Sequence, residues 1–152
     1  MMIRRASFAD IPQMQLVRNS VKENRLSDPR LVPDRDYEIY LAERGSGWVS
    51  EKEGQVVGFA IIDLHDHNVW ALFLNPAFEK QGIGRKLHDT MINWYFQQTR
   101  EPVWLGTSPH TRAEEFYRAA GWTEIGIHGK GEIKFEMTAD NWLMRSQANP
   151  SK

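Results

Sequence analysis

The sequence predicts a single α/β domain over residues 1–152, with a mixed central sheet of about seven strands and flanking helices. Three observations predict this fold. The chain has 152 residues, the usual size of one domain with an ordinary core. It contains no repeat and no low-complexity tract. Apolar stretches at residues 69–74 and 103–107 each run through a polar turn into a segment with helical spacing. The expected element order is β-α-α-β-β-β-α-β-α-β-β.

The first third of the chain predicts a strand followed by two helices. The strand ends before Ser7, and Ser7 with Asp10 three positions later is typical of a helix start. A second helix is expected to be capped by Asp34 or Asp36 and to end at Gly45. The apolar stripe of the first helix consists of Ile11, Met14, Val17 and Val21.

The rest of the chain predicts a hairpin and then strands that alternate with helices. Glu53-Gly54 suits a tight turn between strands at residues 48–51 and 55–63. The segment after 139 is either a frayed tail or a segment that docks through Trp142, Leu143 and Met144. The other expected elements are strands at 69–74, 103–107, 122–127 and 132–137, and helices at about 83–98 and 111–120.

Composition excludes several classes of protein. The chain has 19 basic and 20 acidic residues and a net charge of −1, so charge gives no case for binding nucleic acid or an anionic membrane. No apolar run is long enough to span a bilayer, and the N-terminus lacks a secretory apolar stretch. The absence of cysteine excludes disulfides and a thiolate nucleophile, and we expect a cytoplasmic protein.

One segment between a strand and a helix predicts a binding site. Two glycines at a helix start let backbone N–H groups approach a ligand closely and point at it together. The helix dipole and three cationic side chains add positive charge there. These features predict a diphosphate cradle made mostly of main chain, although glycine can also serve packing at such a junction. The segment reads Glu79-Lys80-Gln81-Gly82-Ile83-Gly84-Arg85-Lys86-Leu87.

The spacing excludes two common glycine motifs. A dinucleotide-binding fingerprint needs a third glycine where Leu87 stands, and a Walker loop needs a Gly-Lys-Ser/Thr ending that the chain lacks. The segment instead resembles motif A of the GNAT superfamily of acyl-CoA-dependent N-acetyltransferases. In that motif, Arg/Gln-x-x-Gly-x-Gly/Ala binds the coenzyme A pyrophosphate. Gly82 and Gly84 match it, whereas Glu79 departs from it and weakens one side-chain contact.

A second motif downstream supports the resemblance. Residues 109–122 are similar to the family's Asn-x-x-Ala-x-x-Phe-Tyr-x-x-x-Gly-Phe, with His110 in place of Asn and Trp122 in place of Phe. Gly121 also suits the left-handed position after a helix. The resemblance covers residues 2–138 and extends to a bacterial subgroup of the family. The matching residues are Ala113, Phe116, Tyr117 and Gly121.

The resemblance implies acetyl-CoA as cosubstrate and Tyr117 as the general acid. Tyr117 matches the family tyrosine near the coenzyme sulfur, and an ordinary tyrosine pKa of about 10 keeps the phenol protonated at neutral pH. The alternative is that Tyr117 only packs beside Phe116. The strand at 69–74 is expected to meet the pantetheine arm through its backbone. The implied coenzyme-binding residues are Phe73, Leu74, Glu79, Lys80, Gln81, Gly82, Ile83, Gly84, Arg85, His110 and Tyr117.

The sequence does not identify a general base. Many relatives carry a glutamate on the strand before motif A, but this strand begins Val69-Trp70-Ala71. His65-x-His67 lacks further ligands at a recognisable spacing, so we expect no metal site. The nearby candidates for the base are Glu51, Asp63, His65, Asp66 and His67, and water is the alternative.

The acceptor site is the least defined part of the sequence. Arg25 and Asp28 lie between the first two helices, which cover the acceptor cleft in the family. They either orient a charged group of the acceptor or cap helices and pair with each other. We expect an N-acetyltransferase that acts on the primary amine of a small molecule, as a monomer or homodimer. The alternatives are acetylation of a peptide or protein N-terminus and a non-catalytic acyl-CoA-binding module.

Overall fold

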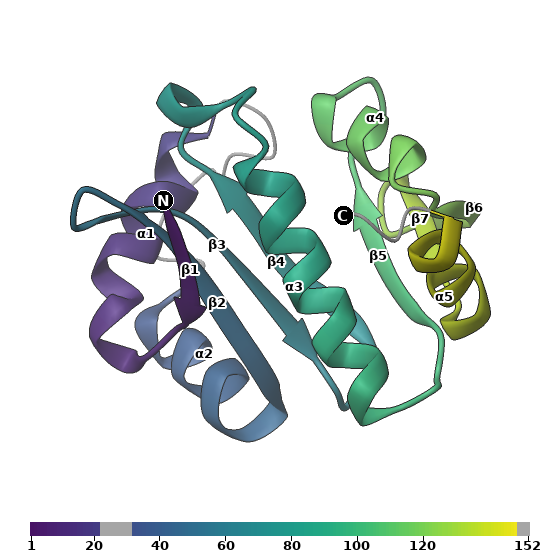
Figure 1. Ribbon diagram of the computed structural model, residues 1–152, viewed down its shortest axis with the longest axis horizontal. Helices are drawn as coiled ribbons and strands as arrows, with labels where there is room; N and C mark the ends of the chain where they lie inside the picture. The colour runs from purple at the N-terminus through teal and green to yellow at the C-terminus, as the bar shows by residue number, and fades with distance from the viewer. Residues whose placement is uncertain (22–31, 149–152) are drawn as a thin grey trace. The chain divides into compact units, whose positions relative to one another are not determined.

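A computed structural model describes residues 1–21 and 32–148, and the side chains of these ranges up to residue 145 (Figure 1). Contacts divide the chain into two compact units, Met1–Tyr95 and Phe96–Lys152. Among the described residues, no helix is long and apolar enough to cross a membrane.

The sheet of the first unit contains four antiparallel strands in the order β1-β2-β3-β4. The predicted hairpin is confirmed, because β2 and β3 pair up to Lys52 and Gln55. Glu53 and Gly54 between them both have positive φ, 54° and 79°, the conformation that a tight two-residue turn requires. The strands are β1, Met2–Arg5; β2, Gly45–Lys52; β3, Gln55–Asp63; and β4, Asn68–Leu74.

The first helices begin close to where the sequence places them. The Ser7–Asp10 capping box is confirmed: the Ser7 N–H donates to the Asp10 carboxylate at 2.8 Å. The prediction that Asp34 or Asp36 caps the second helix is wrong, because Pro33 holds the N-cap position and both aspartates lie in the first turn. The helices are the 3-10 turn η1, Phe8–Asp10; α1, Ile11–Ser20; α2, Asp34–Ile39; and the π-helical turn η3, Tyr40–Arg44.

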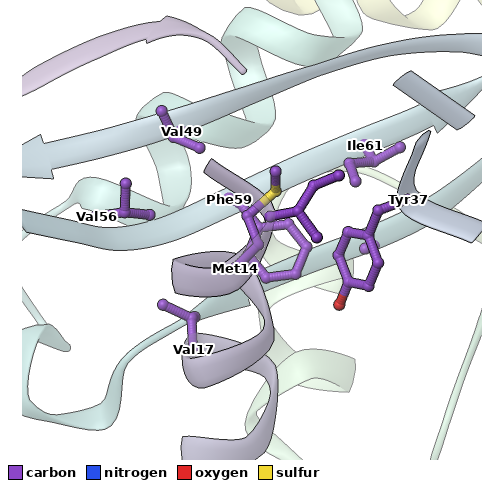
Figure 2. Packing of buried hydrophobic residues seen from close by; sticks show 9 residues of the cluster. Met14, Val17, Tyr37, Val49, Val56, Phe59 and Ile61 are labelled. Carbon is purple, nitrogen blue, oxygen red and sulfur yellow. The ribbon is translucent and has the colours of Figure 1, made fainter. Parts of the chain in front are cut away.

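Helices α1 and α2 cover one face of this sheet and form the main core. Met14 and Val17 of α1 lie against side chains of β2 and β3, and Tyr37 of α2 lies beside them (Figure 2). Strand alternation directs the intervening side chains to the other face. Gly58 on that face approaches Leu87 of helix α3, Ile83–Gln98, which covers it. The buried members of the core are Ile11, Met14, Val17, Tyr37, Val49, Val56, Phe59, Ile61 and Ala71.

A β-bulge interrupts the alternation in β4. Ile61 pairs with Ala71 and Ile62 pairs with Val69, so Trp70 is an extra residue in the strand. As a result, Trp70 and Ala71 both pack on the side covered by α1 and α2. Trp70 stacks on Tyr40 with 4.3 Å between ring centroids.

The second unit contains a three-stranded antiparallel sheet in the order β5-β7-β6. Gly121, with a φ of 93°, ends α4 as predicted. The N–H of Trp122 bonds to the Tyr117 carbonyl at 3.0 Å and that of Gly121 to the Arg118 carbonyl at 3.1 Å, a Schellman pattern. The elements are β5, Val103–Thr107; α4, Arg112–Ala119; β6, Thr123–His128; β7, Glu132–Met137; and α5, Ala139–Ala148.

Residues 139–148 form helix α5, so the prediction of a frayed tail is wrong for this range. Trp142 of α5 is buried, while Leu143 and Met144 are exposed. The docking alternative therefore holds for Trp142 alone of the three side chains. Burial of Trp142 and Ala139 gives this short helix the packing contacts that an isolated helix of its length lacks.

Candidate functional site

A short capped turn joins the end of β4 to the start of α3. The Asn75 side-chain oxygen accepts a hydrogen bond from the Ala77 N–H at 3.0 Å, and this bond begins the 3-10 turn η4, Pro76–Phe78. The Glu79 N–H then bonds to the Pro76 carbonyl at 3.3 Å. These local bonds fix how the chain enters the glycine segment.

Two residues in the left-handed conformation shape the glycine segment. Lys80 has a φ of 64° and Gly82 a φ of 80°, and α3 begins at the next residue. The Gly82 carbonyl accepts the first helical bond, from the Lys86 N–H at 3.2 Å. The first N–H groups of an α-helix have no acceptor within the helix. Backbone turns of this kind gather N–H groups into a concave site for an anion.

The space in front of the glycine pair is open. A Cβ added to Gly84 would meet no atom within 4 Å, and the same holds for Gly82. Internal packing therefore does not require Gly84, and the packing alternative for this glycine is wrong. The residues present fit a bulky anion that lies against the backbone, as a coenzyme A pyrophosphate would.

The side chains around this cradle differ in their exposure and in whether they are paired with other side chains. Lys80 and Gln81 are exposed. Arg85 is partly neutralised by Asp89, whose two carboxylate oxygens each lie 3.3 Å from Nε. Lys52 reaches the cradle from the end of β2 and donates to the Gln81 side-chain oxygen at 3.0 Å. The sequence gives no sign of Lys52 because it lies in a separate hairpin.

Phe73 and Leu74 occupy the end of β4, the last strand of the sheet in this unit. They pair with Phe59 and Gly58 of β3. The Phe73 ring packs against the core formed with α1 and α2, 5.7 Å from the Phe59 ring. Both residues thus lie in the strand that leads into the cradle, as the sequence predicts.

His110 and Tyr117 belong to the second unit, at the start and in the body of α4. His110 has a φ of 62° and is exposed, and its N–H donates to the Glu114 carboxylate at 2.7 Å. This bond, with a second from Arg118, holds the pKa of Glu114 below its usual value. Thr111 caps the helix, since its hydroxyl oxygen accepts from the Glu114 N–H at 3.2 Å.

Tyr117 is 7% exposed and packs among aromatic rings. Its ring centroid lies 5.6 Å from that of Trp122 and 6.2 Å from that of Phe135. Burial raises the pKa of the Tyr117 phenol above its usual value, because a phenolate would lose its hydration. The phenol therefore stays protonated at neutral pH, the state that a general acid needs.

The carboxylates proposed from sequence as general bases are held in ion pairs. Asp63 is 1% exposed and accepts from Arg44 Nη2 at 2.7 Å. Asp66 shares that arginine, at 2.9 Å. Glu51 lies 2.9 Å from Arg4. These contacts orient the carboxylates within the fold.

The two histidines near β4 lie in different settings. His65 is exposed, whereas His67 Nδ1 lies 2.9 Å from the buried Tyr95 hydroxyl. Over residues 1–21 and 32–148, no group of three or more His, Asp or Glu side chains could hold a metal ion. Arg25 and Asp28, the residues suggested for the acceptor, lie outside the described residues.

Comparisons with known proteins converge on one family. A family model described as "Acetyltransferase (GNAT) family" matches residues 13–122, a span that includes the glycine cradle and α4. A curated relative, an uncharacterized N-acetyltransferase of Archaeoglobus fulgidus, is 28% identical over 134 residues. That match covers 77% of this chain and 89% of the relative.

Solved structures have the same fold. The PaiA N-acetyltransferase from Thermoplasma acidophilum, solved in complex with coenzyme A, matches with a TM-score of 0.78 and 13% identity. The match covers 90% of this chain and 98% of that one. A ribosomal-protein-alanine N-acetyltransferase from Brucella melitensis matches with a TM-score of 0.73 and 23% identity, over 91% and 99% of the two chains. These likenesses confirm the predicted fold class, an α/β fold with about seven strands and flanking helices.

Proposed function

This chain belongs to the acetyltransferase (GNAT) family and is an acyltransferase, and we propose that it transfers the acetyl group of acetyl-CoA to the primary amine of a small molecule. The observation that carries the proposal is the open backbone cradle at the start of α3. Gly82 has a φ of 80°, and a Cβ added at Gly84 would meet no atom within 4 Å. A glycine at a position where packing does not require one favours a ligand that lies against the main chain.

The coenzyme follows the chain from β4 into the cradle. The pyrophosphate lies against the main chain from Gln81 to Arg85, at the positive end of the α3 dipole. Lys80 is exposed and adds a full positive charge. Lys52 lies close to the proposed pyrophosphate position, because it donates a hydrogen bond to the Gln81 side chain. The backbone of Phe73 and Leu74 pairs with the pantetheine amides. His110 completes the set of proposed coenzyme contacts.

The chemistry needs a neutral amine, a polarised thioester carbonyl and a proton for the leaving thiolate. The amine nitrogen bonds to the acetyl carbon as the carbon–sulfur bond breaks, and Tyr117 donates its phenolic proton to the sulfur. A main-chain N–H of β4 stabilises the charge that develops on the carbonyl oxygen. The buried Tyr117 phenol stays protonated at neutral pH, so it has a proton to donate.

The proton that the amine loses passes to water, and water returns a proton to the Tyr117 phenolate, so that the phenol is restored for the next turnover. Asp63, Asp66 and Glu51 each have an arginine partner within 3 Å, and this supports a water route over direct abstraction by a carboxylate. An amine that is already neutral needs no strong base, and holding the two reactants together supplies much of the rate acceleration.

A peptide N-terminus is the second candidate acceptor. The Brucella melitensis structure, named for acetylation of a ribosomal-protein alanine, matches 91% of this chain. A peptide acceptor would require an open groove, whereas a small amine requires only a pocket. The mass of the acetylated product distinguishes a peptide acceptor from a small amine.

A screen of acceptors with acetyl-CoA tests the proposal. Free thiol release is followed over small primary amines, amino acids, and short peptides with an N-terminal alanine. We expect turnover with one or more small amines, lost in Tyr117→Phe. Turnover confined to peptides would favour the second candidate. Failure of coenzyme A to bind would contradict both.

A further inference from the structure

The first unit contains a hollow between helices α1 and α2 and strand β4. Its volume is about 80 Å³, which is room enough for a small polar group or a few water molecules. The β4 bulge helps to form it, because Trp70 and Ala71 both lie on this side of the sheet. The residues that line it are Arg18, Val32, Tyr37, Trp70, Ala71 and Phe73.

Arg18 is the charged member of this described lining. Its guanidinium carbon lies 4.0 Å from the Phe73 ring centroid, so the flat cation rests on the aromatic face. The Arg18 Nε is buried and has no hydrogen-bond acceptor among residues 1–21 and 32–148. Burial lowers the pKa of Arg18, and the neighbouring Tyr37 opposes this effect. A buried donor without an acceptor is costly unless a ligand supplies one.

Other arginines in the same unit show how this fold satisfies a guanidinium. Arg4 is paired with Asp10 and Glu51, and Arg44 is paired with Asp63 and Asp66. Within the described part of the chain, no ion pair of this kind is found for Arg18. The same helix-covered face that excludes water from the core thus contains a cation with one N–H that no described residue accepts.

We propose that this hollow binds the carboxylate of the acceptor, so that the small molecule acetylated by this enzyme is an amine that also carries a carboxylate. This inference rests on the proposed function and narrows its substrate class. A planar guanidinium fork matches a carboxylate in two-point contact, and a desolvated site strengthens that contact. One cation among apolar and aromatic walls suits one negative charge better than the two of a phosphate. Phe73, which supports the guanidinium, lies in the strand proposed to hold the pantetheine arm.

Matched pairs of probes test the inference. The pairs are glycine with glycinamide, L-alanine with L-alaninamide, and L-phenylalanine with L-phenylalaninamide. Each pair differs in the carboxylate and keeps the amine. Equilibrium binding to the coenzyme A complex is measured by calorimetry, and turnover is measured by thiol release. The variants are Arg18→Gln and Arg18→Lys, and Arg35→Gln removes an exposed cation from α2 as the control.

We expect the wild type to bind the carboxylate member of one or more pairs at least tenfold more tightly than its amide. Arg18→Gln abolishes this preference, Arg18→Lys keeps part of it, and Arg35→Gln leaves it unchanged. Coenzyme A affinity stays within twofold in all three variants. The thermal midpoints of the variants show whether each one is folded.

Two results would overturn the inference while the proposed function stands. One is turnover of the amides as efficient as that of the acids. The other is an equal loss of affinity for the acid and for its amide in Arg18→Gln. Absence of binding by every carboxylate probe also overturns it. Carboxylate binding that depends on Arg18 without acetyl transfer to any amine would instead retain the site and refute the proposed function.

Discussion

The Asp63 carboxylate, at the end of β3, accepts hydrogen bonds from Arg44 at 2.7 Å from Nη2 and 3.1 Å from Nε. Its other oxygen accepts from the His65 N–H at 2.8 Å. Both oxygens are thus committed to holding the turn between β3 and β4. A carboxylate in this position stabilises the strand that leads to the cradle instead of accepting a proton from substrate.

Replacement of Asp63 by Asn is therefore expected to cost stability and to leave the pH profile of turnover in place. Breaking a buried ion pair costs about 3–5 kcal/mol, and Arg44 is partly exposed, so we expect a value near the lower end, about 3 kcal/mol. Chemical denaturation measures it. Asp66→Asn is the matched control, since Asp66 shares Arg44 but is 71% exposed, and it should cost less than about 1 kcal/mol. Loss of the acidic limb of the pH–rate profile in Asp63→Asn would show that Asp63 is the base.

A second ion pair predicts how stability depends on pH. Arg4 donates to both oxygens of Asp10, at 2.8 and 2.9 Å, and these bonds hold the pKa of Asp10 below its ordinary value of 3.8, with burial opposing them. A carboxyl with a lowered folded pKa contributes stability above the unfolded pKa and loses it as the pH falls through the folded value.

We expect Asp10→Asn to be less stable than wild type by about 2 kcal/mol at pH 7, and the gap should narrow as the pH falls below about 4. Urea unfolding at a series of pH values measures this. Asp140→Asn removes an exposed partner of Arg100 and should show neither effect. A gap that stays constant down to pH 2 would mean that the carboxylate charge is not what stabilises the fold.

Tyr117 is expected to contribute to turnover more than to coenzyme affinity. Tyr117→Phe keeps the ring that packs against Trp122 and Phe135, but it removes the phenolic proton. Loss of a general acid typically lowers turnover about 10²–10⁴-fold. Because burial raises the Tyr117 pKa, wild-type turnover should not fall through ionisation of this phenol below pH 10.

Steady-state kinetics and coenzyme binding measure these effects together. Tyr95→Phe is the control, since it removes a buried phenol that contacts His67 and should affect stability without a comparable loss of turnover. A Tyr117→Phe enzyme with turnover within twofold of wild type would assign Tyr117 to packing alone.

Much of the fold could be predicted because local signals and periodicity agree with it. The Ser7–Asp10 capping box, the Glu53-Gly54 turn and Gly121 after α4 each place an element end through residues a few positions apart. Such features depend on local backbone chemistry, which the sequence displays directly.

The features that could not be predicted depend on tertiary contacts. The bulge at Trp70 depends on register with β3, and α5 depends on the burial of Trp142. In the sequence, Arg18 is indistinguishable from an ordinary polar position of α1, and its contact with the Phe73 ring is formed only in the folded protein. Lys52 and Gln81 are likewise joined by the fold and not by any spacing in the sequence.

The most direct test of the account is the affinity of coenzyme A for Gly84→Val, measured by calorimetry. A Cβ added at Gly84 meets no atom within 4 Å, and Val is a better helix former than Gly, so the thermal midpoint should not fall. Gln97→Val places the same side chain at an exposed position of α3 as the control. We predict that Gly84→Val alone weakens coenzyme A binding more than tenfold, at unchanged stability. Wild-type affinity in a folded Gly84→Val protein would contradict the central claim that this cradle holds the coenzyme.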